Sequence, residues 1–230
     1  MDGHGGGRDL ESPPVRTYAD QISSGGASES EIIEGALAAA DAAPGLRWLD
    51  IGCGRGDLLK RVRDGCRPAA LHGVDPIDWL AEDLRGDVHL HTVPAEEVGA
   101  LEPMDRVMLV EVIEHLEAPW SVLRSAARLL VAGGVIVVTT PNLATLRNRL
   151  ELGLRGNLTS FRPDYEPHVS PALPHVTSRI LAEEGLAVEP VRYAGADVIS
   201  LTGGRKWPSG LRARYPVLAS ISVIVSARRR

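Results

Sequence analysis

Residues 49–57 read Leu-Asp-Ile-Gly-Cys-Gly-Arg-Gly-Asp, and they decide the fold of this chain of 230 residues. An apolar run precedes them and a helical pattern begins at Asp57, which predicts a turn from a strand into a helix. Glycine at alternate positions lets the backbone turn sharply and lets a ligand approach it closely. The spacing is G-x-G-x-G, whereas a dinucleotide loop has G-x-G-x-x-G and a P-loop ends in Lys-Ser or Lys-Thr. A phosphate group is therefore not the expected ligand.

A second carboxylate follows the next apolar run, which ends in Gly73-Val74-Asp75. At the end of a second parallel strand, Asp75 can accept hydrogen bonds from both hydroxyls of a ribose, as the acidic residue does in nucleoside-binding α/β folds. The glycine loop and Asp75 together predict a ligand that contains a ribose. The alternative is a tight turn that binds nothing.

Short apolar runs alternate with helical patterns along the rest of the chain. The predicted strands are 46–51, 69–74, 88–93, 106–110, 135–140, 187–193 and 220–225. The first predicted helix begins at Ser28 or Ser30 and continues through Ala40. The other predicted helices are 57–62, 77–84, 95–101, 120–130, 143–154 and one that ends at 180–185. Continuous apolar strands separated by helices indicate a parallel sheet covered on both faces. We therefore expect an α/β fold with a doubly wound, mostly parallel sheet of seven strands.

The chain is predicted to form one domain, residues 27–230, after a flexible arm at 1–26 that is rich in Gly, Ser and Pro. Two irregular stretches, about 143–174 and 200–209, interrupt the domain. Long loops inside a compact domain are usually functional or mobile. We expect them, with the arm and its Tyr18, to form a lid and a substrate pocket.

Composition limits the partners and the compartment. The net charge of −5 and the pI near 5.8 argue against a protein that coats nucleic acid, so nucleic acid is an unlikely partner and a small molecule the expected one. Cys53 and Cys66 lack metal-type spacing, and neither a signal peptide nor a bilayer-spanning run is visible. The expected location is the cytoplasm, without a membrane anchor. Lys occurs only at Lys60 and Lys206, which suggests a GC-rich bacterial genome. The oligomeric state is not predicted.

At these residues the sequence resembles the class I S-adenosylmethionine-dependent methyltransferases. Residues 49–56 look like their first motif, residues 73–76 (Gly-Val-Asp-Pro) like the second, and Ala95-Glu96-Glu97 like the segment that lines the adenine. Residues 110–116, Val-Glu-Val-Ile-Glu-His-Leu, resemble the signature of the subgroup that contains ubiquinone-type O-methyltransferases. The resemblance implies a Rossmann-like fold and S-adenosylmethionine as cofactor.

Two further stretches extend the resemblance to about residues 32–225. Residues 130–134 are similar to the turn before the fifth strand, and residues 168–186 can be aligned with a segment that begins with His and ends in Glu-Glu-Ala-Gly-Phe. Val93-Pro94 departs from the family pattern, which removes an expected Asp contact to adenine but leaves the backbone at Ala95. Ala132 stands where the family usually has Pro.

The resemblance implies a set of cofactor-binding residues drawn from these motifs and from the arm. They are Tyr18, Asp50, Gly52, Cys53, Gly54, Gly56, Asp75, Pro76, Ala95, Glu96 and Glu111. Asp50 has an alternative role, in which its carboxylate supports the loop by accepting hydrogen bonds from backbone amides. Cys53 is expected to be a small loop residue rather than a nucleophile, because no neighbour in sequence would lower its pKa.

Glu111, Glu114 and His115 follow the fourth predicted strand, and in a helix Glu111 and His115 would share a face. Three interpretations compete: a cofactor contact plus a general base, ligands of a divalent metal, or caps of a short helix. The metal interpretation would be favoured if the folded chain placed His168 beside Glu111, Glu114 and His115. The resulting Glu-Glu-His-His set resembles that of the terminal 2′-O-methyltransferases that act on small RNAs. Such mixed ligands suit Mg²⁺, Mn²⁺ or Fe²⁺ better than structural Zn²⁺.

The expected activity is transfer of a methyl group from S-adenosylmethionine to an oxygen or nitrogen of a small molecule, with natural-product tailoring as one setting. His115 is the first choice for the general base and His168 the second. One alternative is a metal-dependent RNA 2′-O-methyltransferase, and another is a catalytically inactive partner protein that binds the cofactor.

Other polar residues carry weaker signals. His72, His89 and His91 alternate in predicted strands and are expected to be packed or surface residues. The C-terminal stretch 227–230 is expected to be a solvated tail. Arginines at 147, 149, 155 and 162 could bind an acidic substrate, although a surface helix explains them equally well.

Overall fold

The computed structural model describes residues 28–162, 167–199 and 205–230. The predicted arm with Tyr18 lies outside these residues, as do 163–166 of the first irregular stretch and 200–204 of the second.

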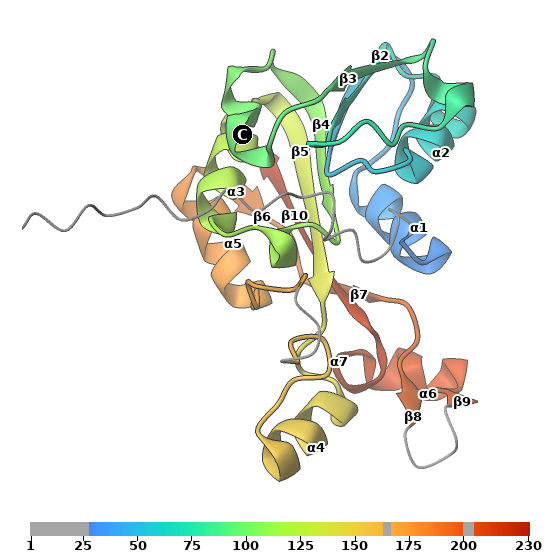
Figure 1. Ribbon diagram of the computed structural model, residues 1–230, viewed down its shortest axis with the longest axis vertical. Coiled ribbons are helices and arrows are strands. Elements are labelled where there is room, and N and C mark those ends of the chain that lie inside the picture. The colour runs from blue at the N-terminus through green and yellow to red at the C-terminus, as the bar shows by residue number, and fades with distance from the viewer. Residues whose placement is uncertain (1–27, 163–166, 200–204) are drawn as a thin grey trace, which may run out of the picture.

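A mixed sheet forms the centre of the molecule (Figure 1). Its strands are β1 (Arg47–Ile51), β2 (Ala70–Val74), β3 (Val88–His91), β4 (Met104–Val110), β5 (Leu130–Pro141), β6 (Leu186–Val188), β7 (Arg192–Ala194) and β10 (Ser222–Arg229). The order is β3-β2-β1-β4-β5-β10-β6, with β7 also paired to β10. Strands β1 to β5 are parallel, and β10 is antiparallel to its neighbours. The predicted doubly wound, mostly parallel fold is confirmed.

The sheet has eight strands where seven were expected. The predicted strand 187–193 is two short strands, β6 and β7, on either side of Pro190. Proline has no amide to donate to a ladder, so the pairing with β10 stops there and resumes.

Helices cover both faces of the sheet, α1 (Ser30–Ala39) and α2 (Asp57–Cys66) on one and α3 (Pro119–Arg128) and α5 (Pro174–Glu183) on the other (Figure 1). Side chains of a strand alternate between faces. Trp48 therefore packs with α1 and α2, and Leu49 packs with α3 and α5, and both are fully buried. The apolar runs of the sequence fill two separate core layers.

The predicted helix 77–84 is wrong, because only a 3-10 turn at Glu82–Leu84 forms there. Asp75 accepts the amide of Ile77, and Asp78 accepts the amide of Leu80. Such side-chain hydrogen bonds compete with helix formation. The predicted helix 95–101 is also a 3-10 helix, Ala95–Ala100.

Three helices lie beyond the carboxyl end of β5: α4 (Leu146–Arg155), α6 (Ser209–Arg214) and α7 (Pro216–Ala219) (Figure 1). The strands β8 (Val198–Ile199) and β9 (Arg205–Lys206) form a separate ribbon there. Asn142 connects α7 to the end of β5, since its side-chain amide donates to the carbonyls of Val217 and Ser220. Asn148 of α4 in turn donates to the Asn142 carbonyl.

The expectation of a solvated C-terminal tail is wrong, because β10 continues through Arg229 inside the sheet. Arg228 donates to the carbonyl of Gly133 and forms an ion pair with Asp41 at 3.0 Å. Among the described residues, no helix combines the length and the apolar character needed to cross a membrane.

Candidate active site

The glycine loop between β1 and α2 has the left-handed backbone that its glycines allow. Gly52, Gly54 and Gly56 have φ values of +75°, +50° and +86°, a region that side chains other than glycine rarely adopt. A Cβ on Gly52 would lie 2.5 Å from Val112, which follows β4. The loop after β1 and the loop after β4 therefore meet.

Asp75 connects the glycine loop to the end of β2. Its Oδ2 accepts the amide of Gly54 at 3.0 Å, and its Oδ1 accepts the amide of Ile77 at 3.1 Å. The carbonyl of Val74 accepts the amides of Gly52 and Cys53. Each carboxylate oxygen keeps a further lone pair, so Asp75 can accept two hydroxyls. Burial raises its pKa, an effect that the two amides oppose.

Asp50 is a buried carboxylate, 4% exposed, beside Asp75. Burial, with a smaller effect of the Asp75 charge, raises its pKa to about 8. Among the described residues it accepts no hydrogen bond from a loop amide, so the alternative role as a support for those amides is wrong. A carboxylate in such a place favours a ligand that brings positive charge.

Cys53 lies buried in the same loop. Burial, and then the charges of Asp50 and Asp75, raise the pKa of its thiol well above the usual range. The thiol is therefore a poor nucleophile at neutral pH, in agreement with the expectation of a loop residue.

The other residues expected at the cofactor lie near the same edge. Pro76 follows Asp75 directly and is half-buried. Ala95 is buried and starts the 3-10 helix after β3, whereas Glu96 beside it is exposed.

Glu111 lies directly after β4, in the left-handed region with φ +55°. Its Oε1 accepts the hydroxyls of Thr139 at 2.7 Å and Ser222 at 2.6 Å, and its amide donates to Thr139. Burial raises its pKa. The expected helical face shared with His115 is wrong, since only Ile113–His115 form a 3-10 turn.

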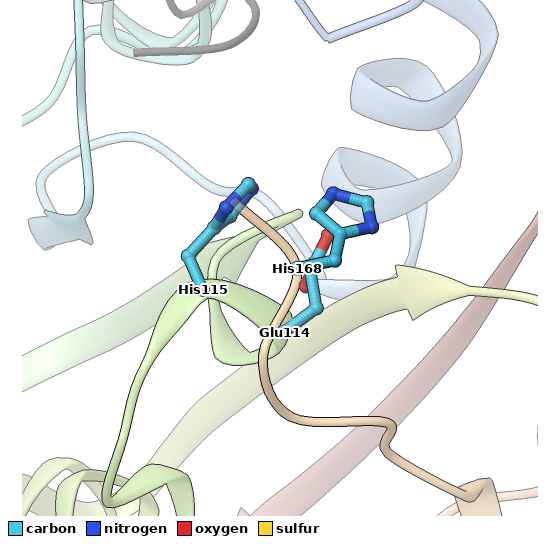
Figure 2. Close-up of side chains that lie close together, drawn as sticks. All are labelled: Glu114, His115 and His168. Carbon is cyan, nitrogen blue, oxygen red and sulfur yellow. The ribbon is translucent and has the colours of Figure 1, made fainter. Parts of the chain in front are cut away.

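Glu114, His115 and His168 come together after this turn (Figure 2). One ligand atom from each lies within 4.8 Å of the others. Figure 2 shows the Glu114 carboxylate rising toward the ring of His168. The two imidazole rings are in edge contact, with centroids 4.7 Å apart. His168 is brought there because Val169 and Ser170 donate their amides to the carbonyl of Glu114.

Two carbonyls determine the tautomers of these histidines. His115 Nδ1 lies 3.0 Å from the carbonyl oxygen of Pro167, and His168 Nδ1 lies 2.7 Å from that of Ser160. A carbonyl oxygen only accepts, so Nδ1 carries the hydrogen in both rings. Nε2 is then the atom with the lone pair in each neutral imidazole.

Burial affects the protonation of all three side chains. It lowers the pKa of His115, and together with the charge of His115 it lowers that of His168 to about 4. Burial and the charge of Glu111 raise the pKa of Glu114 well above its usual range. Glu114 is 1% exposed, and its Oε2 has no hydrogen-bond partner among the described residues. Both imidazoles are neutral near pH 7, and Glu114 favours a proton or a cation.

The structure adds two residues to the site that the sequence analysis missed. They are Thr139 and Ser222, whose hydroxyls donate to the Glu111 carboxylate. Thr139 is the first hydroxyl residue after the apolar run of β5, a signal that could have been noticed. Ser222 lies 111 residues from Glu111, and no local pattern indicates their contact. Two of the arginines considered as ligands of an acidic substrate already have partners within the chain. Arg155 forms an ion pair with Glu151 on the surface of α4, and Arg149 donates a hydrogen bond to the carbonyl of Ala144.

Comparison with known proteins supports the assignment that these features suggest. The profile of a family described as "Methyltransferase domain" matches residues 29–191. The ubiquinone biosynthesis O-methyltransferase of Burkholderia thailandensis is 27% identical over 199 residues, 81% of this chain and 79% of that protein. A SAM-dependent methyltransferase from Archaeoglobus fulgidus has a TM-score of 0.61 at 20% identity, covering 86% of this chain and 91% of its own.

A third comparison includes a bound product. The N-methyltransferase NodS from Bradyrhizobium japonicum, solved with S-adenosyl-L-homocysteine, has a TM-score of 0.54 at 14% identity and covers 86% of this chain and 83% of its own. The fold and the glycine loop are those of the class I S-adenosylmethionine-dependent methyltransferases. The chain belongs to the methyltransferase domain family, and it is an S-adenosylmethionine-dependent methyltransferase.

Proposed function

We propose that this enzyme methylates an oxygen of a small molecule, with His115 as general base; a nitrogen acceptor is the second choice. The observation that carries the proposal is the neutral His115, whose Nδ1 is held by the carbonyl of Pro167 and whose Nε2 keeps its lone pair. The curated relatives act in ubiquinone biosynthesis as O-methyltransferases, which favours a hydroxyl acceptor. The composition, which suggests a GC-rich bacterial genome, favours natural-product tailoring as the setting.

S-adenosylmethionine supplies the methyl group on its sulfonium. The chain's own residues bind and orient: Asp75 accepts the ribose hydroxyls, and Ala95 offers its backbone to the adenine. We propose that the buried Asp50 carboxylate receives the positively charged methionine part of the cofactor, because it otherwise has no compensating group. Gly52, Gly54 and Gly56 allow the close approach.

Removal of the acceptor proton is the second task of the site. A hydroxyl becomes a better nucleophile as its proton leaves, and a positioned base contributes typically 10²–10⁴-fold. His115 Nε2 is the first candidate and His168 Nε2 the second, since both rings have the same tautomer. Glu111, held by Thr139 and Ser222, is proposed to line the cofactor side of this site.

A divalent metal is a second candidate, supported by the donor geometry. The Glu114 carboxylate and one imidazole nitrogen each of His115 and His168 form a mixed oxygen and nitrogen set. Metal-binding histidines usually donate their other ring N–H to a carbonyl or carboxylate, and both rings do so here. The unpartnered Oε2 of Glu114 also fits a cation. Such an ion, Mn²⁺ more readily than Mg²⁺, would polarise an acceptor oxygen.

The metal set differs in one member from the one expected from sequence. Glu111 is not among the three clustered side chains, because Thr139 and Ser222 bind its carboxylate. An RNA substrate is not favoured, since the exposed Arg155 is paired on its own helix. A role as inactive partner is not favoured either, since the glycine loop and Asp75 have an intact geometry.

The acceptor pocket is proposed to form from α4, α6 and the loops around them, beyond the carboxyl end of β5 (Figure 1). The stretches 143–174 and 200–209 remain our proposal for the lid, with the arm as a further contributor. The two free cysteines are consistent with the cytoplasm as the proposed compartment.

The experiment measures S-adenosylhomocysteine release with a panel of phenols, catechols and amines for the wild type and for His115→Ala, His168→Ala and Glu114→Gln. His175→Ala, an exposed histidine on α5, is the matched control. A general base predicts that His115→Ala lowers turnover roughly 10²–10⁴-fold with nearly unchanged S-adenosylhomocysteine affinity. A metal site predicts loss with chelator, recovery with Mn²⁺ or Mg²⁺, and similar losses in all three variants. Full activity of a stable His115→Ala enzyme without added metal would exclude both roles.

A further inference from the structure

The edge of the sheet carries a pair of histidines that contact each other across two strands. His72 is on β2, and His91 ends β3, which among the described residues pairs only with β2 (Figure 1). The register places His72 opposite His89, so His91 lies diagonally across from His72 on the same face. His72 Nδ1 and His91 Nε2 are 3.1 Å apart, and the planes of the two rings differ by 10°. One neutral ring therefore donates its N–H to the lone pair of the other.

The backbone of His91 contacts the residue that we propose to bind the ribose. Its carbonyl oxygen accepts the amide of Asp75 at 3.3 Å and the amide of Val93 at 3.0 Å. The register pairs His91 with Val74, directly before Asp75. Val93 leads in turn to Ala95, which begins the 3-10 helix proposed to offer its backbone to the adenine. The ring and the carbonyl of His91 thus connect the edge strand to both sides of the proposed nucleoside site.

The edge strand has few other contacts that would hold its end in place. β3 has four residues, Val88–His91, and only Val88 is buried. Among the described residues, the exposed His89 forms no hydrogen bond with either ring of the pair, although its ring centroid lies 5.1 Å from that of His72. A net intramolecular hydrogen bond changes an equilibrium by roughly 2–10-fold, which is a large share of what holds so short an edge ladder.

We propose that His72 and His91 are positioning residues for the cofactor. Their hydrogen bond holds the end of β3 against β2, and so holds Asp75 and the segment before Ala95 in the arrangement that binds the nucleoside. Acid weakens binding, because a second proton on the pair removes the accepting lone pair and places two imidazolium charges in contact. The inference rests on the proposed roles of Asp75 and Ala95, and neither histidine is assigned a contact with the cofactor.

The surroundings of the pair favour its neutral form. Burial first, and the neighbouring histidines second, lower the pKa of His72, and burial with a neighbouring histidine lowers the pKa of His91. Glu102 opposes the shift at His72, whereas Arg47 on β1, which pairs with Asp105, adds to it. A chain in which the end of β3 has separated from β2 takes up protons first as the pH falls below about 6.5. Acid therefore favours the separated state, and affinity for the cofactor should fall between pH 7.5 and pH 5.5.

The test measures S-adenosylhomocysteine binding by calorimetry on the full chain at pH 7.5 and pH 5.5. His91→Leu removes the hydrogen bond and should weaken binding about three- to tenfold at pH 7.5. His91→Gln places an amide near the position of Nε2, so it can keep the bond without titrating. It should bind as the wild type does at pH 7.5 and lose less affinity at pH 5.5. The matched control is His89→Leu on the same strand, which should keep wild-type affinity at pH 7.5.

The informative quantity at pH 5.5 is the difference between the wild type and His91→Gln. Asp50 and Asp75 also have raised pKa values, but both carboxyls titrate alike in the two proteins. The same loss of affinity in both proteins would overturn the proposal. This comparison remains decisive if His91→Leu does not fold.

Thermal unfolding of the same proteins separates positioning from a contribution to stability alone. A lower Tm of His91→Leu with wild-type affinity, measured well below Tm, would mean that the pair supports only the fold and would also overturn the proposal. Asp75→Ala keeps this result distinct from a failure of the cofactor site. If Asp75→Ala binds as the wild type does, both proposals fail, whereas a large loss there with no effect at His91 refutes only this one.

Discussion

The proposed cofactor region (residues 47–115) and the proposed acceptor region, which comprises α4 (Leu146–Arg155) and α6 (Ser209–Arg214), are built differently. The proposed cofactor region has its candidate ligand-binding groups at the ends of buried parallel strands, and its glycine loop is held by backbone hydrogen bonds from Gly52 and Cys53 to the carbonyl of Val74. In the acceptor region, α4 has a single buried residue, Asn148, and Leu154 on its surface is 82% exposed. The comparison teaches that the first region is held by backbone pairing within the sheet, whereas α4 is held by a few side-chain hydrogen bonds such as that of Asn148.

The largest expected effect concerns the glycine loop. Gly54→Val places a branched side chain at φ +50° and Asp75→Ala removes the acceptor of the Gly54 amide, so each should weaken S-adenosylhomocysteine binding at least a hundredfold. Calorimetry measures the affinity. Gly65→Ala, at a helical position where an added Cβ would have open space, is the control for the glycine, and the exposed Asp87→Ala is the control for the carboxylate. Wild-type affinity in both site variants would contradict the assignment of the loop.

The next effect compares the regions directly by hydrogen exchange. The amides of α4 should exchange at least tenfold faster than those of β5, because β5 pairs on both sides and α4 buries one side chain. Mass spectrometry of peptic peptides from the chain without substrate measures both segments in one sample. Equal protection of α4 and β5 would mean that the acceptor region is as rigid as the sheet and would argue against a lid.

A third prediction concerns Asp50 and pH. The folded chain holds the Asp50 proton up to about pH 8, whereas an unfolded chain releases it near the ordinary value of 3.8. The folded state binds more protons between these values, so the free energy of unfolding should fall as pH rises, by at most about 1.4 kcal/mol per pH unit. Urea denaturation of the cofactor-free chain from pH 5 to pH 8 measures this slope.

Asp50→Asn isolates the contribution of this carboxyl. Glu111 and Glu114 also have raised pKa values and add a slope of the same sign, so the informative quantity is the difference between wild type and variant. The variant should lose less stability over the same pH range. Identical slopes in the two proteins would show that Asp50 ionises normally in the folded chain.

The smallest effect is expected on the surface of α4. Leu154→Ser should change the free energy of unfolding by less than about 0.5 kcal/mol, because the side chain is exposed. Leu123→Ala in α3, a fully buried leucine, should cost about 2–5 kcal/mol. Denaturant titration compares the two. A large loss from Leu154→Ser would mean that α4 is packed in solution, and the contrast between the regions would weaken.

Local sequence patterns predicted the strands and the glycine turn of residues 47–75 well, because these features depend on residues that are close together in the sequence. The glycine loop is one short segment, and Asp75 directly follows the apolar run of β2. The strand that pairs with β2 is β1, which is also a clear apolar run in the sequence. The conformation of Glu111 could not be predicted in the same way, since its carboxylate is bound by Thr139 and Ser222 from distant strands. The approach of His168 to His115 also depends on tertiary contacts, here the amides of Val169 and Ser170.

The position of β10 has a consequence for synthesis on the ribosome. This strand lies between β5 and β6 in the sheet, yet its residues, Ser222–Arg229, are translated long after those of β5, Leu130–Pro141. At roughly 5–20 residues per second, β5 spends several seconds as an unpaired edge, which is a template for incorrect pairing. The nascent chain can therefore form its glycine loop early, but the hydroxyl of Ser222 reaches Glu111 only after β10 has been translated.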